Sequence, residues 1–241
     1  MTVRVLTVEH QTSCPPALLG EWLVEAGCEL DVRRPYADDG LAGFAGLAGL
    51  AGVDGYDAVL VLGGTMDAFD ADVPWLAPTR GLIARAAEHD VPVLGVCLGH
   101  QLAALALGGE VARNPRGRTA GLCPLGRADA FAADPLLAGV TGPAIFSNQD
   151  VVTRLPDGAV ELARAATGEL QAARLAPRVW GLQWHPEATG DIVATWARMH
   201  PDAEAGAGGP EALKAEVDAA REALDADGRA LVEVFVREAT R

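Results

Sequence analysis

The stretch that decides the fold runs from residue 91 to residue 109 and reads VPVLGVCLGHQLAALALGG. Its first part is a continuous apolar run, which is typical of a strand buried on both faces of a parallel sheet. From Leu98 the apolar residues follow helical spacing until Gly108 and Gly109 end the pattern. Cys97 stands where the strand pattern gives way to the helix pattern, so it is either a nucleophile or a small buried apolar residue.

The same strand-then-helix pattern repeats over the first 110 residues. Strand patterns occupy residues 4–10, 29–35 and 56–64, and helix patterns occupy residues 16–27 and 74–90. Between them, residues 40–52 form a low-complexity Ala/Gly/Leu tract to which we assign no chemistry. Strands that alternate with helices predict a parallel, doubly wound sheet.

The second half of the chain consists mainly of short strand patterns joined by turn residues. These patterns lie at residues 119–125, 144–149, 159–165, 170–176 and 179–186. They predict extra strands on the same sheet, some of them antiparallel. A helix pattern follows at residues 189–200. The predicted fold class is therefore α/β, with an open, mostly parallel, doubly wound sheet, added antiparallel strands and a C-terminal helical tail.

We expect one domain over residues 1–200, followed by a linker and a C-terminal helical extension over residues 201–241. In the extension, apolar residues recur mostly at three- and four-residue steps, at positions 213, 217, 220, 224, 231, 234 and 235. Such a stripe marks one buried helix face. We predict that it covers the chain's own domain; covering a partner subunit is the alternative.

Composition excludes several classes of partner. The formal net charge is -14 over 241 residues, and an acidic surface repels phosphate backbones and anionic lipids. No apolar run approaches the roughly 20 residues of a membrane-spanning helix, and the N-terminus starts a strand pattern without a signal sequence. These features predict a cytoplasmic protein that binds neither nucleic acid nor membranes. The four cysteines lack the spacing of a zinc site, so we expect no metal.

The segment from Gly95 to Gly99 fits the Gly-x-nucleophile-x-Gly elbow found at strand-to-helix turns. A nucleophile at that turn adopts a strained conformation, and flanking glycines avoid steric clashes. The Cys97 sulfur would lie at a helix N-terminus, where partial positive charge favours the thiolate. The amide of Leu98 would be an unpaired donor of the first helical turn, available to an oxyanion.

Two further segments lie where they could complete such a site. Gly63 and Gly64 end the preceding strand, at the same carboxyl edge as Cys97, where ligands bind in open α/β sheets. His185 and Glu187 follow a later strand and flank Pro186. In an extended segment, side chains two residues apart point the same way, so the carboxylate can orient the imidazole.

Taken together, these segments resemble the class I, triad-type glutamine amidotransferase family. The likeness includes stand-alone members related to the amidotransferase domain of GMP synthase. It is carried by residues 57–76, 91–111, 146–163 and 179–187, which include GVCLG and HPE. The resemblance implies a Cys-His-Glu triad and no cofactor.

By this resemblance, Cys97 is the nucleophile, His185 is the general base and acid, and Glu187 orients His185. The backbone amides of Gly64 and Leu98 form the oxyanion hole.

Four further positions are implied to bind the amino-acid end of the substrate: Gln101, Ser147, Asn148 and Gln149. The sequence departs from the family pattern at two places. Asn148 stands where relatives often carry histidine, and Thr65 stands where proline is the commoner residue after the glycine pair.

The implied function is a glutamine amidotransferase-type hydrolase, which releases ammonia from the glutamine side-chain amide through a cysteine thioester. A separate synthetase subunit would use the ammonia. Two alternatives stay open: a free-standing γ-glutamyl peptide hydrolase with the same triad, and a non-catalytic regulatory relative. Glycine permits backbone rearrangement, so the loop at residues 63–65 could place the Gly64 amide in the oxyanion hole only when a partner binds. Slow turnover by the lone chain is then expected.

Overall fold

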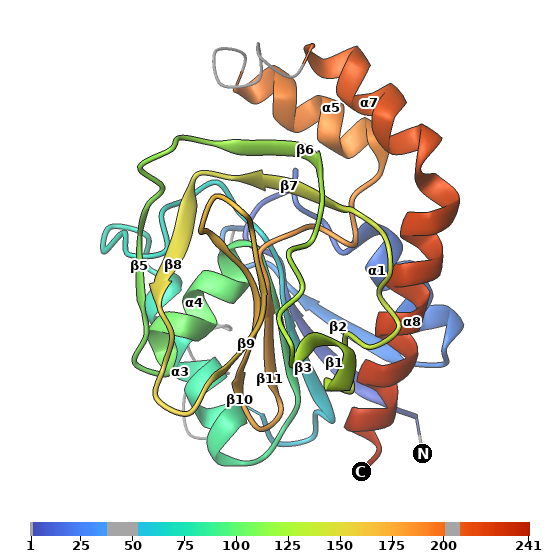
Figure 1. The fold of residues 1–241 in the computed structure, drawn as a ribbon. Helices are drawn as coiled ribbons and strands as arrows, with labels where there is room; N and C mark the ends of the chain where they lie inside the picture. Colours follow the sequence, from blue (N-terminus) through green and yellow to red (C-terminus); the bar gives the residue numbers. More distant parts are fainter. Residues whose placement is uncertain (1, 38–52, 201–207) are drawn as a thin grey trace.

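The computed structural model describes residues 2–37, 53–200 and 208–241. The Ala/Gly/Leu tract at residues 40–52 and most of the expected linker lie outside the described residues. A seven-stranded sheet forms the centre of the molecule, in the order β2-β1-β3-β4-β11-β10-β9 (Figure 1). Its strands are β1 (Arg4–Val8), β2 (Glu29–Arg33), β3 (Ala58–Val61), β4 (Val93–Val96), β9 (Val160–Arg164), β10 (Leu170–Ala176) and β11 (Val179–Leu182).

The first five strands in that order pair in parallel, whereas β10 pairs antiparallel with both β11 and β9. From β1 the order runs to β2 in one direction and through β3 to β4 in the other, as in a doubly wound sheet. The predicted fold class is therefore confirmed.

The strands at the centre of the sheet are buried on both faces. In β3, Ala58 and Leu60 belong to one apolar cluster, while Val59 and Val61 belong to another. Successive side chains of a strand point to opposite faces, so these two clusters are the cores above and below the sheet. This arrangement explains why the strands read as continuous apolar runs.

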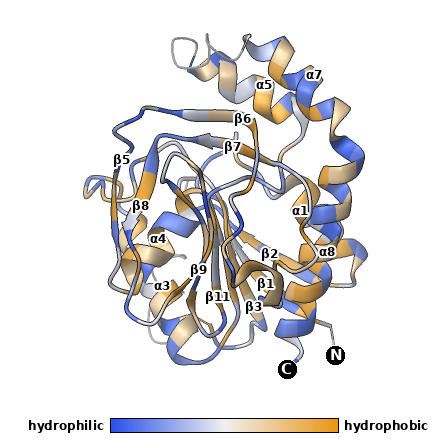
Figure 2. Ribbon diagram, viewed as in Figure 1, coloured by the Kyte–Doolittle hydropathy of each residue, from blue (hydrophilic) through white to orange (hydrophobic). Residues whose placement is uncertain are grey.

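Helices cover both faces of the sheet (Figure 1). On one face lie α1 (Ala17–Glu25) and α8 (Arg221–Ala239), which supply Trp22 and Phe235 to the first cluster. On the other lie α3 (Leu76–Glu88) and α4 (Leu98–Ala106), which supply Leu82 and Leu102 to the second. Figure 2 shows that these helices carry both hydrophobic and hydrophilic residues, as expected of helices with one buried face.

The strand patterns at residues 119–125 and 144–149 were expected on the central sheet, and that expectation is wrong. These segments form β6 (Thr119–Cys123) and β7 (Ala144–Asn148), which pair antiparallel with each other. A second antiparallel pair consists of β5 (Glu110–Arg113) and β8 (Asp150–Arg154). A strand pattern records local burial, whereas the pairing partner depends on distant residues. Both small sheets lie beside the end of the central sheet that holds the site described below (Figure 1).

The C-terminal stripe is divided between two helices, α7 (Pro210–Ala219) and α8, with Ala220 between them. Leu213 and Val217 of α7 are buried in a cluster that also contains residues of α5 (Gly190–Met199). Leu231 and Phe235 of α8 are buried in the first core cluster. The stripe thus packs on the chain's own residues, while the domain boundary at residue 200 stays a prediction.

The remaining short element is a 3₁₀ helix, η1 (Phe131–Ala133). Within residues 2–37, 53–200 and 208–241, no helix has the length and apolar character needed to cross a membrane.

Candidate active site

Cys97 connects β4 to α4 in a conformation that few residues other than glycine adopt, with φ 51° and ψ -105°. Positive φ is strained for a residue with a Cβ atom. The flanking glycines make the tight turn possible. A Cβ atom on Gly95 would lie 2.5 Å from the carbonyl oxygen of Gly99, and one on Gly99 would lie 2.1 Å from the carbonyl oxygen of Val61. The strand-to-helix turn is therefore closely packed, as a nucleophile elbow requires.

The thiol of Cys97 lies at the N-terminus of α4, where the helix dipole and unpaired amides favour negative charge. Its side chain is 5% exposed and contacts the pocket, and Sγ lies 3.9 Å from the carbonyl oxygen of Ser147. Leu98 is the first residue of α4, and its side chain packs in the second core cluster. Its amide therefore belongs to the first helical turn beside the thiol.

His185 lines the pocket and is paired with Glu187, which lies behind it. His185 Nδ1 lies 2.7 Å from Glu187 Oε1, and both side chains are almost fully buried. The backbone amide of His185 donates to the carbonyl oxygen of Ile145 at 2.8 Å, which fixes the segment against β7. The ring of Trp196 packs on the His185 imidazole, with 4.4 Å between ring centroids. The imidazole is thus held from several sides.

The balance of charges around His185 favours its protonated form. Burial lowers the pKa of the imidazole, but the charges of Glu187 and Cys97 and the hydrogen bond to Glu187 raise it by more. The net effect raises the pKa of His185 to about 10. At neutral pH the site therefore holds an imidazolium beside the Glu187 carboxylate.

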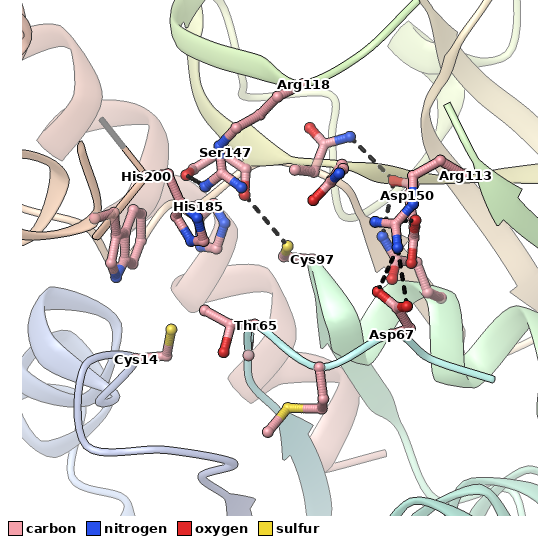
Figure 3. A pocket seen from close by; sticks show the side chains of 16 residues that line it. Cys14, Thr65, Asp67, Cys97, Arg113, Arg118, Ser147, Asp150, His185 and His200 are labelled. Atoms are coloured by element: carbon pink, nitrogen blue, oxygen red, sulfur yellow. Dashed lines mark hydrogen bonds and ion pairs between the residues drawn. The ribbon is translucent and has the colours of Figure 1, made fainter. Parts of the chain in front are cut away.

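A cavity of about 60 Å³ lies next to Cys97, and Figure 3 shows the side chains that line it. Seven of the residues identified from the sequence line this cavity: Gly64, Cys97, Gln101, Ser147, Asn148, Gln149 and His185. Two others do not line it, since Glu187 contacts His185 through its carboxylate and Leu98 points its side chain into the core. Gly63 lies close by, because a Cβ atom there would be 3.0 Å from His185 Cε1 and 3.6 Å from Cys97 Cβ.

The side chain of Gln101 is fixed by hydrogen bonds on the pocket wall. Its Nε2 donates to the carbonyl oxygen of Asp150 at 2.9 Å and to Gln183 Oε1 at 3.2 Å. Asn148 Nδ2 also donates to the Asp150 carbonyl, at 3.1 Å. Asn148 thus braces the backbone that follows β7.

Charged residues that the sequence did not identify also line the cavity. Arg113 joins Asp67, at 2.9 Å, to Asp150, at 3.0 Å. Burial raises the pKa of the Asp150 carboxyl; nearby Asp67 raises it too, and Arg113 only partly offsets this. Arg118 Nη2 donates to Ser147 Oγ at 2.6 Å. Arg113 and Arg118 lie outside the motifs identified from the sequence, whereas Asp67 reaches the site with the loop that follows β3.

The remaining residues that line the cavity are Cys14, Thr65, Met66, Trp196 and His200. The Trp196 indole donates to the carbonyl oxygen of Ser13 at 2.7 Å, which joins the β1–α1 turn to the wall. Across the part of the chain that the structure describes, no cluster of three or more His, Cys, Asp or Glu side chains is placed to hold a metal.

Comparison with known proteins identifies the family. The family model described as "Glutamine amidotransferase class-I" matches residues 18–192. A glutamine-hydrolysing GMP synthase subunit of Methanosarcina mazei is 41% identical over 106 residues, which cover 42% of this chain and 53% of that protein. The corresponding protein of Methanococcoides burtonii is 39% identical over 102 residues, which cover 41% of this chain and 51% of that protein. The matches thus span about half the length of these curated relatives.

Solved structures share the fold over nearly the whole chain. A glutamine amidotransferase from Thermotoga maritima superposes with a TM-score of 0.83 and 22% identity, covering 98% of this chain and 99% of its own. A glutamine amidotransferase from Methylobacillus flagellatus gives a TM-score of 0.80 at 23% identity, covering 98% of this chain and 94% of its own. The family model spans well over half of the sequence, including the elbow and the His185–Glu187 pair. The chain belongs to the class-I glutamine amidotransferase family.

Proposed function

We propose that this chain hydrolyses the side-chain amide of glutamine and releases ammonia, with Cys97, His185 and Glu187 as its catalytic triad. One observation carries the proposal. A cysteine held at positive φ at a helix N-terminus shares a pocket with a buried imidazole that is paired to a carboxylate. A cysteine that served only as a small core residue would need neither the strained turn nor the charged partner.

In the first half of the reaction, the Cys97 thiolate attacks the δ-carbon of glutamine. A carbon–sulfur bond forms, and the carbonyl electron pair moves to the oxygen, which the amides of Leu98 and Gly64 stabilise. Each such donor contributes about 10² to 10³ in rate. The tetrahedral intermediate then collapses, the carbon–nitrogen bond breaks, and protonated His185 gives its proton to the departing ammonia.

The second half hydrolyses the γ-glutamyl thioester. His185, now neutral, takes a proton from water, and the hydroxide oxygen attacks the thioester carbon. The carbon–sulfur bond breaks, glutamate leaves and the Cys97 thiolate is restored. Glu187 remains ionised throughout, because its role is to fix the imidazole tautomer and to stabilise the imidazolium.

The charged rim of the cavity suits the amino-acid end of glutamine. The backbone from Ser147 to Gln149 would hold the α-carboxylate, with the Arg118 guanidinium beside Ser147. Gln101 would contact the same end of the substrate from α4. A separate synthetase subunit would consume the ammonia, which is suggested by the names of the curated relatives, since each is one subunit of a GMP synthase.

Product analysis of the purified chain tests the proposal. Given glutamine, the wild-type chain should release glutamate and ammonia in equal amounts, and Cys97→Ala should release neither. Mass spectrometry of the acid-quenched enzyme should find one glutamyl group on Cys97. Rapid turnover of a γ-glutamyl dipeptide with glutamine a poor substrate would favour the peptide hydrolase. No turnover of either compound would favour a non-catalytic relative.

A further inference from the structure

The loop that carries the proposed oxyanion donor Gly64 is tied to the turn that follows β1. Gln11 Oε1 accepts two hydrogen bonds from Thr65, one from the backbone amide at 3.1 Å and one from Oγ1 at 2.7 Å. Thr65 lines the pocket and is labelled in Figure 3. The Gln11 carboxamide therefore fixes the residue next to Gly64 through both its backbone and its side chain.

The other end of the same carboxamide is also bound. Gln11 Nε2 donates to Ser13 Oγ at 2.6 Å and to Cys14 Sγ at 3.4 Å. The carbonyl oxygen of Ser13 accepts the hydrogen bond of Trp196, whose ring packs on His185. These bonds determine which end of the carboxamide faces Thr65. Gln11 thus connects the Gly64 loop to the wall that holds the catalytic imidazole.

Gly64 itself is packed on its other sides. A Cβ atom there would lie 2.5 Å from Met66 Sδ, 2.8 Å from Leu98 Cδ2 and 3.1 Å from His10 Cβ. The backbone of Gly64 therefore lies directly against Leu98, the residue that supplies the other proposed oxyanion amide. Leu98 packs against Gly64, and the next residue, Thr65, is hydrogen-bonded to Gln11. Together these contacts hold the loop in one arrangement.

The contact depends on both donors of Thr65, its amide hydrogen and its hydroxyl group. A proline at position 65 would have neither, so it could donate neither hydrogen bond to Gln11. Threonine donates both. Thr65 therefore adds a connection to a loop that is also held by the hydrogen bond from the Leu62 amide to the Val8 carbonyl oxygen and by the Arg113–Asp67 ion pair.

We propose that Gln11 is a positioning residue, which acts through Thr65 to hold the Gly64 amide ready for the oxyanion without a partner subunit. This inference rests on the proposed function. Its consequence is that the lone chain hydrolyses glutamine at a substantial rate, in contrast to the slow turnover expected of a loop that a partner must order. Gln11 does not line the pocket, so its influence should fall on the transition state and not on substrate binding.

Steady-state kinetics with glutamine test the proposal. Gln11→Leu should lower kcat by about tenfold to a hundredfold, part of the 10² to 10³ that one oxyanion donor contributes, while KM changes by less than about threefold. Gln11→Glu keeps an acceptor oxygen for Thr65 and should recover most of the lost kcat. Gln171→Leu is the matched control, because that carboxamide is likewise bonded at both ends, with its oxygen accepting from Gly126 N and its nitrogen donating to Pro124 O, and it does not line this pocket. It should lower the midpoint of thermal unfolding without lowering kcat.

Thr65→Val breaks the hydroxyl bond from the opposite side and makes the test independent of how well the Gln11 variants fold. If the two residues act through one contact, Gln11→Leu combined with Thr65→Val should lower kcat no more than Gln11→Leu alone. Additive losses, or a wild-type kcat in folded Gln11→Leu, would overturn the proposal.

Alkylation by a diazoketone analogue of glutamine separates failure of this inference from failure of the proposed function. A wild-type chain that is labelled at Cys97 but hydrolyses glutamine only when a partner is added retains the proposed active site and overturns the role of Gln11. A chain that is neither labelled nor active refutes the proposed function and the role of Gln11 with it. Labelling at Cys97 together with turnover by the lone chain supports both.

Discussion

Nδ1 of His185 lies 2.7 Å from Oε1 of Glu187, and neither side chain is more than 3% exposed. The extended segment expected from the sequence is wrong here: residues 186 and 187 form a turn, in which the Ala188 amide donates to the His185 carbonyl oxygen at 3.4 Å, and this turn brings the two side chains together. Because Nδ1 is hydrogen-bonded to Glu187, only Nε2 is available to exchange a proton with the substrate. In the proposed mechanism the pair thus determines which nitrogen exchanges protons with the substrate, and Glu187 supplies the negative charge that stabilises the imidazolium.

This relationship predicts unequal effects of triad substitutions. Cys97→Ala should abolish glutamine hydrolysis, because no bond to carbon can form, and His185→Ala should nearly do so. Glu187→Gln should retain at least about tenfold more kcat than His185→Ala, because it orients the ring without exchanging a bond. Circular dichroism would establish that each variant is folded. A folded Glu187→Gln as inactive as Cys97→Ala would show that Glu187 has a more direct role.

Thiol reactivity should single out Cys97 among the four cysteines. Burial, followed by the charges of Cys97 and Glu187, raises the pKa of Cys14 to about 12. Burial is also the main cause of the raised pKa values of Cys28 and Cys123. The three thiols are thus held in the unreactive protonated form, whereas Cys97 has the helix N-terminus and the His185 imidazolium beside it.

Limited treatment with iodoacetamide followed by peptide mapping measures this difference. Cys97 should be modified first, in step with loss of activity, and glutamine should slow its modification. The assignment would fail if Cys14 or Cys123 were alkylated first while activity remained intact.

The glycine after the nucleophile should tolerate no side chain. A Cβ atom at Gly99 would lie 2.1 Å from the Val61 carbonyl oxygen in the adjacent strand, so Gly99→Ala requires the backbone to move. We expect it to lower the free energy of unfolding by more than about 2 kcal/mol, as strained core substitutions do. Urea titration of the purified variant would measure the loss.

Gly81→Ala is the matched control, since Gly81 lies on the exposed face of α3 and a Cβ atom there meets nothing within 4 Å. Alanine in place of this helical glycine should stabilise the chain by about 0.5 to 1 kcal/mol. Equal effects of the two substitutions would contradict the packing described at the elbow.

The parts of this molecule that the sequence predicted are those set by local patterns. The strand and helix at residues 91–109 were predicted because burial on both sheet faces and helical spacing are visible within one segment. The pairing of β6 with β7 was not predicted. Residues 119–123 and 144–148 are separated by 20 residues, and those residues carry no signal of the pairing.

The candidate site divides in the same way. Cys97 and the His185–Glu187 pair have recognisable neighbours in sequence, whereas Arg113 and Cys14 line the pocket without any local motif. Their presence depends on where β5 and the β1–α1 turn lie in space. The roles assigned to the triad, the oxyanion amides and the substrate-binding residues stay predictions that the experiments above decide.

Two buried histidines predict how the stability of the fold depends on pH. His10 and His100 are fully buried, and within the described part of the chain their ring nitrogens make no hydrogen bond. Burial disfavours the charged ring and lowers the pKa of each to about 3, from 6.5 in an unfolded chain. At pH values between about 3 and 6.5, these histidines therefore bind protons in the unfolded chain but not in the folded chain.

Stability should therefore fall as the pH falls from about 6.5 towards 3, and each histidine should add about 1.4 kcal/mol per pH unit to that slope. His185 adds nothing to this slope. Because its pKa is raised to about 10, it affects stability only between pH 6.5 and about 10, where the stability it contributes falls as the pH rises. Urea unfolding at pH 6 and pH 4 measures the slope. His100→Gln should flatten it by about 1.4 kcal/mol per pH unit, whatever its effect at pH 7.

His89→Gln, at an exposed position that follows α3, controls for the loss of a histidine as such. The slope is the decisive quantity, because a packing defect at residue 100 lowers stability equally at every pH, whereas proton binding by the unfolded chain does not. An unchanged slope in His100→Gln would mean that the buried ring is protonated in the folded state. It would then need a negative partner, which the contacts of His100 in this structure do not supply.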